Sequence, residues 1–184
     1  MRKDRQRIGL IPMGEIPDIA PKVIAAHISG FLDLQTIFLE SMQNPFYALD
    51  KQRLQYDVGP ILRQLESRLF KSVDKVIGIL DVDLFVPVFT HVFGEARQGG
   101  RVALLSIFRL RENGMDTISD SAIALERAAK IALHELCHLY DLTHCENRHC
   151  LMHFSGSLSD LDQGSFNLCR YCKRFFEDAV LTES

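Results

Sequence analysis

Three histidines, a glutamate and two cysteines lie within the short segment His134–Cys145, which reads HELCHLYDLTHC. If this region is helical, His134 and His138 lie one turn apart on the same face, with side chains about 6 Å apart. Two imidazoles at this spacing can bind one cation, as in the HExxH zinc motif. Because a catalytic zinc takes three protein ligands and leaves one position for water, His144 is the candidate for the third ligand. The segment predicts a zinc site at the C-terminal end of a helix.

Glu135 is the residue that we expect to carry proton transfer at this site. A carboxylate beside a zinc-bound water can act as a general base, while the metal lowers the pKa of the water to about 7 and polarises a carbonyl. The alternative is a solvated helix face whose histidines bind no metal. A third histidine shortly after the motif argues against that alternative.

Composition is that of a soluble globular protein, with 184 residues, 47% hydrophobic and 24% charged. We expect a single domain over 1–184, with sheet and helices to about residue 140 and a zinc-bound C-terminal subdomain over about 141–184. The net charge of −3 offers no basic surface for nucleic acid. No secretory signal or long apolar span is visible, so we expect a cytoplasmic protein without membrane contact. The sequence does not specify the oligomeric state.

Four cysteines form a second candidate metal site in the pattern C-x4-C-x18-C-x2-C, at Cys145, Cys150, Cys169 and Cys172. Two close pairs separated by a loop are typical of a structural four-thiolate zinc site. Such a metal stabilises the fold because it binds the ordered loop and not the unfolded chain. Two disulfides, free thiols and a redox-active CxxC remain as alternatives. The fifth cysteine, Cys137, is expected to be a small buried apolar residue.

Other histidines are given no ligand role. His149 and His153 lie close enough in sequence to replace His144 or a thiolate, but we expect them outside both ligand sets. His27 and His91 lie far from the motif, and we expect each to be partly exposed or hydrogen-bonded.

Hydrophobic periodicity predicts alternating strands and helices, and therefore an α/β chain. Pro87 favours an edge position for its strand, because proline cannot donate to a β-ladder. The helix before the HExxH motif is apolar on most of its surface, which predicts a buried central helix. The expected strands are Arg7 to Met13, Leu34 to Leu39, Val76 to Leu80, Val86 to Phe93 and Val102 to Arg109. The expected helices are Asp18 to Phe31, Gly59 to Phe70, about Ser119 to Leu139, and Cys169 or Cys172 to Val180.

The combined motif resembles the archaemetzincins, a branch of the metzincin zinc metallopeptidases. It reads His134-Glu135-x2-His138-x5-His144-Cys145-x4-Cys150-x-Met152, followed by Cys169-x2-Cys172. It covers about residues 134–172, and the order of elements before it is compatible over nearly the whole chain. The resemblance implies a compact α/β (α+β) fold with a twisted mixed sheet, an antiparallel edge strand, a long active-site helix, a Met-turn and a C-terminal helix.

The resemblance also implies a role for each motif residue. His134, His138 and His144 correspond to the ligands of the catalytic zinc, and Glu135 to the general base or acid. The four cysteines from Cys145 to Cys172 correspond to a second, structural zinc site, which makes two zinc ions per chain. Met152 corresponds to the methionine of the Met-turn, beneath the catalytic metal. Val88 to Phe93 is our candidate for the edge strand that aligns an extended peptide.

Asp141 departs from the metzincin pattern, which usually has glycine three residues after the second histidine. The chain turns there towards the third ligand. Aspartate tolerates a left-handed conformation better than most residues, at a cost of about 1 kcal/mol. We therefore expect a strained or altered turn before His144.

The sequence thus predicts a zinc-dependent peptidase that acts on peptides or proteins. One alternative is a zinc-stabilised peptide- or protein-binding module with little or no turnover, which would have no need of Glu135. Another is a zinc-ribbon nucleic-acid binder built on the cysteines, which the acidic net charge argues against.

Overall fold

A five-stranded mixed sheet forms the centre of the molecule, for which the computed structural model describes residues 6–111, 118 and 121–183. The strand order is β2-β1-β5-β8-β7. The first four strands are parallel, and β7 pairs antiparallel with β8 at the edge. This arrangement confirms the predicted fold class. The strands are β1 (Arg7–Met13), β2 (Gln35–Phe38), β5 (Lys75–Leu80), β7 (Gly94–Ala96) and β8 (Val102–Ser106).

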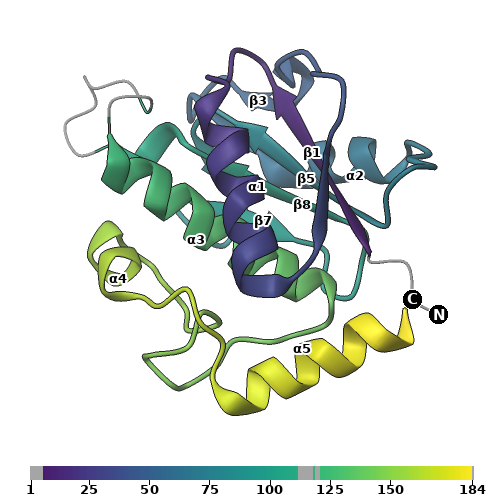
Figure 1. Cartoon of the computed structure of the whole chain (residues 1–184). Coiled ribbons are helices and arrows are strands. Elements are labelled where there is room, and N and C mark those ends of the chain that lie inside the picture. The colour runs from purple at the N-terminus through teal and green to yellow at the C-terminus, as the bar shows by residue number, and fades with distance from the viewer. Residues whose placement is uncertain (1–5, 112–117, 119–120, 184) are drawn as a thin grey trace.

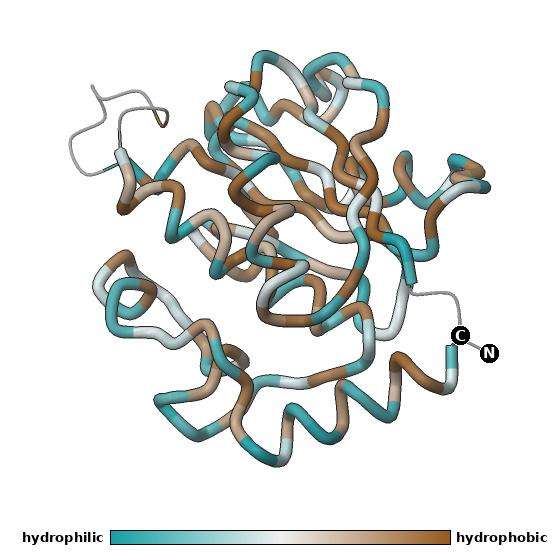
Figure 2. Tube along the Cα trace, viewed as in Figure 1, coloured by the Kyte–Doolittle hydropathy of each residue, from teal (hydrophilic) through white to brown (hydrophobic). Residues whose placement is uncertain are grey.

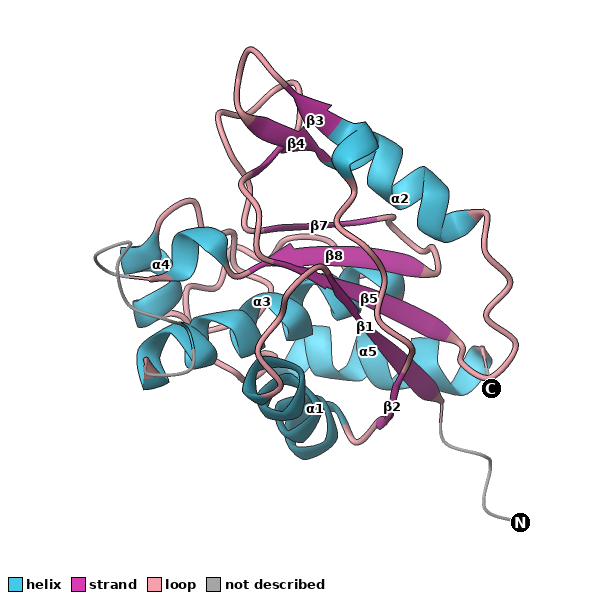
Figure 3. Cartoon of the chain, turned by 90° about the horizontal axis from the view of Figure 1, so that it is seen from above, coloured by secondary structure: helices cyan, strands magenta, loops and turns pink. Residues whose placement is uncertain are grey.

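Helices cover both faces of this sheet. Helices α1 (Ile19–Leu32) and α3 (Ala122–Leu139) pack on one face, and α2 (Val58–Glu66) packs on the other (Figures 1 and 3). Alternate residues of a strand point to opposite faces. In β8, Ala103 and Leu105 accordingly belong to the hydrophobic core between the sheet and the helices α1 and α3. Val102 and Leu104 belong to the core between the sheet and α2. Burial on both faces explains the continuous apolar runs in the sequence.

A small second sheet lies beside the main one and was not predicted. It has the order β3-β4-β6, with β3 (Leu49–Asp50), β4 (Gln55–Asp57) and β6 (Leu84–Phe85). These strands are two or three residues long, too short to show a periodic pattern. The strand β6 leads through residues 86–93, here called the rim loop, into the edge strand β7.

The predicted edge strand at Val88 to Phe93 is wrong. Those residues form the rim loop, in which the N–H of Phe89 donates to Val86 O (3.0 Å) and Val92 alone bridges to Leu84. Pro87 has no N–H to donate to a ladder. Phe93 O accepts a hydrogen bond from the N–H of Ser106 in β8 (2.8 Å), and the strand itself begins at Gly94. The predicted strand at 102–109 is also shorter than expected, because a 3-10 turn follows at Phe108–Leu110.

The C-terminal part wraps around the end of α3 (Figure 1). It contains α4 (Leu158–Gln163), which was not predicted, and α5 (Arg170–Thr182), which confirms the last predicted helix. Along α5, hydrophilic and hydrophobic residues alternate in the hydropathy trace (Figure 2), and Phe176 is its buried residue. None of the described helices is long and apolar enough to cross a membrane.

Candidate metal centres

The helix α3 presents two of the predicted ligands from its last turns. Its described part begins after Ser121, whose side chain accepts a hydrogen bond from the N–H of Ala124. Ser119, where we expected this helix to begin, lies outside the described residues. His134 and His138 lie one turn apart, with ring centroids separated by 4.7 Å. The buried surface of α3 fixes the direction in which both imidazoles point.

The turn after α3 has the left-handed conformation expected at Asp141, with φ of 65°. The N–H of Asp141 donates to His138 O (3.0 Å), which closes the helix. The amide of Gln98 holds the turn from outside, because Nε2 donates to Asp141 Oδ1 (3.1 Å) and Leu142 O (3.1 Å). The aspartate therefore receives a hydrogen bond that glycine could not accept.

The turn brings His144 next to the two helical histidines. Its ring centroid lies 5.2 Å from that of His134 and 4.9 Å from that of His138. One ring nitrogen from each of the three side chains lies within 4.8 Å of the others. The structure therefore brings together the three histidines selected from the sequence.

Backbone contacts orient the helical imidazoles for a cation. Nδ1 of His134 donates to Leu151 O (2.9 Å), and Nδ1 of His138 donates to Leu142 O. Carbonyl oxygens only accept, so these Nδ1 atoms carry the protons and the Nε2 atoms keep their lone pairs in the neutral rings.

The two Nε2 atoms lie 3.0 Å apart. Lone pairs at this distance repel each other unless a cation lies between them. Two nitrogen ligands of a tetrahedral zinc are about 3.3 Å apart, given a zinc–nitrogen bond of about 2.0–2.1 Å. The donor set therefore fits zinc.

Burial favours the neutral, metal-binding form of all three rings. It lowers the pKa of His134 to about 3, with a further contribution from His138. Burial also lowers the pKa of His138 and of His144. A metal ligand must be unprotonated, so these imidazoles meet that condition at neutral pH.

Glu135 is buried beside the histidines, with 8% of its surface exposed. Burial raises the pKa of its carboxyl well above the usual range, and the charge of Glu95 acts in the same direction. A cation at the three imidazoles acts in the opposite direction, since it favours the carboxylate. The edge strand approaches closely here: a Cβ at Gly94 would lie 2.8 Å from Glu135 Cγ and 2.9 Å from Oε1.

The four cysteines of the second pattern also come together. The sulfur atoms of Cys145, Cys150, Cys169 and Cys172 lie within 4.8 Å of one another. Sγ of Cys145 is 3.9 Å from Sγ of Cys169, whereas a disulfide requires about 2.05 Å. Tetrahedral zinc with bonds of about 2.3 Å separates its sulfur ligands by about 3.8 Å. This donor set also fits zinc, and all five cysteines of the described chain are unbridged.

The thiols of Cys137 and Cys169 have pKa values that are shifted in opposite directions. Cys137 is fully buried in α3, outside the four-cysteine group, and burial raises the pKa of its thiol. The backbone of Cys172 is the largest of the influences that lower the pKa of Cys169 to about 7. A lowered thiol pKa favours metal binding, so Cys169 is suited to be a ligand, whereas burial raises the pKa of the Cys150 and Cys172 thiols. Cys137 is a core residue because it is buried outside the group.

A tight turn at Cys150–His153 links the two groups. Leu151 O accepts the hydrogen bond from His134, and Met152 O accepts one from the N–H of Cys145 (2.8 Å). His153 lies outside both groups, with Nδ1 3.0 Å from Cys145 O. His149 is exposed. The carbonyls of Leu142 and Leu151 are functional groups that sequence reasoning missed, because backbone acceptors carry no residue signature.

A cleft of about 1380 Å³ opens over the histidines and Glu135. The edge strand β7 and the last residues of the rim loop line one side, and residues after the Cys150–His153 turn line the other. His91, which we expected to be partly exposed or hydrogen-bonded, lines this cleft from the rim loop.

A buried helix with an HExxH motif, a third histidine and a cleft beside a sheet edge defines the zinc metallopeptidase class. The sequence matches the profile of peptidase family M54 over residues 34–178. The chain belongs to peptidase family M54, and the protein is therefore a zinc metallopeptidase, a hydrolase.

Its relatives are archaemetzincins, as the motif predicted. The chain is 34% identical to the archaemetzincin of Methanopyrus kandleri over 166 residues, which are 89% of this chain and 91% of the relative. It is 33% identical to that of Pyrococcus furiosus over 183 residues, 96% and 95% of the two chains.

The fold agrees with solved structures of the same family. The crystal structure of the Methanopyrus kandleri archaemetzincin matches with a TM-score of 0.85 at 31% identity and 98% coverage of both chains. The Archaeoglobus fulgidus archaemetzincin, complexed with malonate, matches with a TM-score of 0.79 at 29% identity, covering 92% of this chain and 99% of that one.

Proposed function

We propose that this protein hydrolyses peptide bonds at a zinc ion held by His134, His138 and His144, with Glu135 as general base and acid. The observation that carries the proposal is the pair of opposed Nε2 atoms, 3.0 Å apart, beside a buried carboxylate in the same cleft. Zinc in such a site lowers the pKa of a bound water to about 7 and polarises a carbonyl.

The residues around the metal each have a defined part in this proposal. Glu135 accepts a proton from the attacking water and then donates it to the leaving amine. The backbone carbonyls of Leu142 and Leu151 hold the imidazoles in one tautomer and orientation. Met152, fully buried in the turn, forms an apolar floor under the site. The edge strand β7 aligns the substrate backbone.

We further propose that Cys145, Cys150, Cys169 and Cys172 hold a second, structural zinc. The sulfur spacing and the lowered pKa of Cys169 support this role. Because Cys145 follows His144 directly, a metal at the cysteines also fixes the backbone that presents the third histidine.

Replacement of Glu135 tests the catalytic proposal. In Glu135→Gln, we expect kcat for a broad peptide library to fall by about 10²–10⁴-fold, with zinc content unchanged. Glu177→Gln is the matched control, because Glu177 is exposed on α5 and does not line the cleft. Equal cleavage by wild type and Glu135→Gln contradicts the mechanism. Tight peptide binding without products from the zinc-loaded wild type supports the binding-module alternative.

Zinc stoichiometry tests the two-site proposal. We expect two zinc ions per wild-type chain and one in Cys169→Ser, measured by elemental analysis of the purified proteins. Cys137→Ala should keep both ions, since Cys137 lies outside the group. A single zinc ion per wild-type chain would contradict the two-site proposal.

A further inference from the structure

Two phenylalanines line the cleft near the histidine cluster and come from different segments of the chain. Phe89 belongs to the rim loop, and Phe154 follows the Cys150–His153 turn. Their ring centroids are 6.5 Å apart, with an angle of 29° between the planes. This separation is near the outer limit of about 7 Å for direct aromatic contact. The rings therefore stabilise each other only weakly.

Both rings remain available to a ligand. Phe89 is 50% exposed and Phe154 is 51% exposed, although burial of aromatic surface is strongly favourable. A small number of exposed aromatic side chains in a concave site is typical of ligand recognition. An apolar side chain that packs against both rings would bury surface on each of them.

The position of Phe154 relates this pair to the reaction. Its ring lies edge-on to His144, with centroids 5.3 Å apart. An extended peptide advances about 3.3 Å per residue. A side chain that packs against both rings therefore belongs to a residue within about two positions of the bond at the metal.

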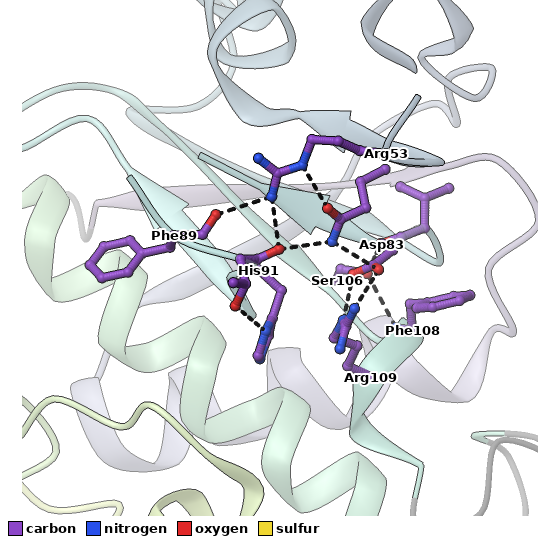
Figure 4. Close-up of polar contacts among 10 residues, drawn as sticks. Arg53, Asp83, Phe89, His91, Ser106, Phe108 and Arg109 are labelled. Carbon is purple, nitrogen blue, oxygen red and sulfur yellow. Dashed lines mark hydrogen bonds and ion pairs between the residues drawn. The ribbon is translucent and has the colours of Figure 1, made fainter. Parts of the chain in front are cut away.

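The rim loop is held in place from the side opposite the cleft. Arg53 Nη2 donates to Phe89 O (3.2 Å) and Thr90 O (3.0 Å), and Gln55 Nε2 donates to Thr90 O (2.9 Å) and Asp83 Oδ2 (3.0 Å). Figure 4 shows these contacts, with the Phe89 ring directed away from Arg53. Asp83 is itself held by Arg109, which donates two hydrogen bonds of 2.5 and 2.6 Å to its carboxylate.

These contacts satisfy loop carbonyls that have no strand partner. They also preorganise the loop, which lowers the entropic cost of binding. Phe89 thus presents its ring from a fixed backbone rather than from a loop that must order on binding.

We propose that Phe89 and Phe154 form an aromatic bracket that binds an apolar side chain of the peptide substrate beside the scissile bond, with aromatic side chains preferred. The bracket rests on the proposed peptidase function and adds the substrate class. It makes Phe89 a specificity-determining residue and Arg53 a positioning residue.

The test compares zinc-loaded wild type, Phe89→Ala and Val88→Ala. The probes are fluorescence-quenched peptides of alanine and glycine in which a single Phe, Leu or Ala occupies each position in turn. Val88 is the matched control because it precedes Phe89 in the same loop, is 81% exposed, and does not line the cleft. Zinc content is measured for all three proteins.

We expect wild type to prefer Phe over Ala at one position. Phe89→Ala should reduce this preference, expressed as a ratio of kcat/KM values, by about 3- to 10-fold, and Val88→Ala should preserve it. An unchanged ratio in a Phe89→Ala protein that still cleaves overturns the bracket and leaves the peptidase function intact.

If wild type cleaves no peptide, a binding measurement still tests the aromatic bracket. That result contradicts the proposed function, and the same peptides, labelled with fluorescein, are then titrated into the three proteins. Weaker binding of the Phe peptide to Phe89→Ala alone supports the bracket. Equal binding to all three proteins overturns it.

Discussion

At the scale of single residues, Gly94 decides where Glu135 can lie. This glycine is on the edge strand β7, and any side chain there would enter the space of Glu135 and Ile131. The edge strand therefore approaches α3 more closely than an alanine would allow. Its φ is not positive, so the need for glycine comes from this contact and not from backbone conformation.

We expect Gly94→Ala to lower kcat by about 10²-fold, because a shift of about 1 Å in a catalytic group can cost that much. Zinc content should stay unchanged, since no histidine is replaced. Gly30→Ala is the control, because Gly30 lies on the exposed side of α1 with nothing near its Cβ position. Steady-state kinetics and zinc analysis are carried out on wild type and both variants. A wild-type kcat in Gly94→Ala would show that Gly94 does not set the position of Glu135.

At the scale of elements, the small sheet β3-β4-β6 supports the cleft through the rim loop. Arg53 follows β3, and its guanidinium lies 3.9 Å above the ring centroid of Phe85 in β6. The same guanidinium binds two rim-loop carbonyls. The small sheet therefore holds the rim loop, which lines the cleft, in place.

Arg53→Ala should make the rim loop more mobile. We expect faster amide exchange at residues 86–93 and a KM for apolar peptides raised about 2- to 5-fold, with kcat changed less, because hydrogen bonds of about 0.5–1.5 kcal/mol are lost. Exchange mass spectrometry and steady-state kinetics give both readouts. Lys51→Ala, in the same exposed turn, should behave as wild type. If amide exchange in the rim loop of Arg53→Ala is unchanged, Arg53 does not hold the loop in place.

At the scale of the whole molecule, we expect the C-terminal part to depend on metal more than the sheet does. The strands β5 and β8 are buried along their whole length, whereas α5 buries Phe176 alone among its residues. Phe176 packs on Tyr140, with ring centroids 5.1 Å apart, and Lys75 pairs with Glu183 at 2.7 Å. Ala179 and Val180 of α5 are only partly buried against the core, so a structural metal can add to the stability of this part.

Removal of zinc with a chelator should therefore loosen residues 141–183 before the sheet. We expect faster amide exchange in α5 and around the Cys150–His153 turn, with β1, β5 and β8 still protected, and a lower Tm. Addition of zinc should restore both. Equal loss of protection in β5 and α5 would show that the C-terminal part does not depend selectively on metal.

Much of this protein could be predicted from local patterns. The buried strands, the helices α1, α3 and α5, and the two groups of metal-binding side chains follow from periodicity and spacing, because both act over short stretches of chain. The helix α2 ends at Glu66, earlier than the predicted Phe70, since apolar residues continue past its end and conceal the boundary.

The edge strand and the walls of the cleft could not be predicted in this way. Val88 to Phe93 has the composition of a strand, but its carbonyls bind Arg53 and Gln55, which lie more than thirty residues away in sequence. Gly94 is required by Glu135, which comes from another element.

The sequence by itself determined the type of metal chemistry, because His134, His138, His144 and the cysteines are chemically distinctive and regularly spaced. The tertiary structure alone decided the tautomers of the imidazoles, the approach of the edge strand and the pairing of Phe89 with Phe154. Each of these depends on contacts between residues far apart in the chain, and such contacts leave no local pattern.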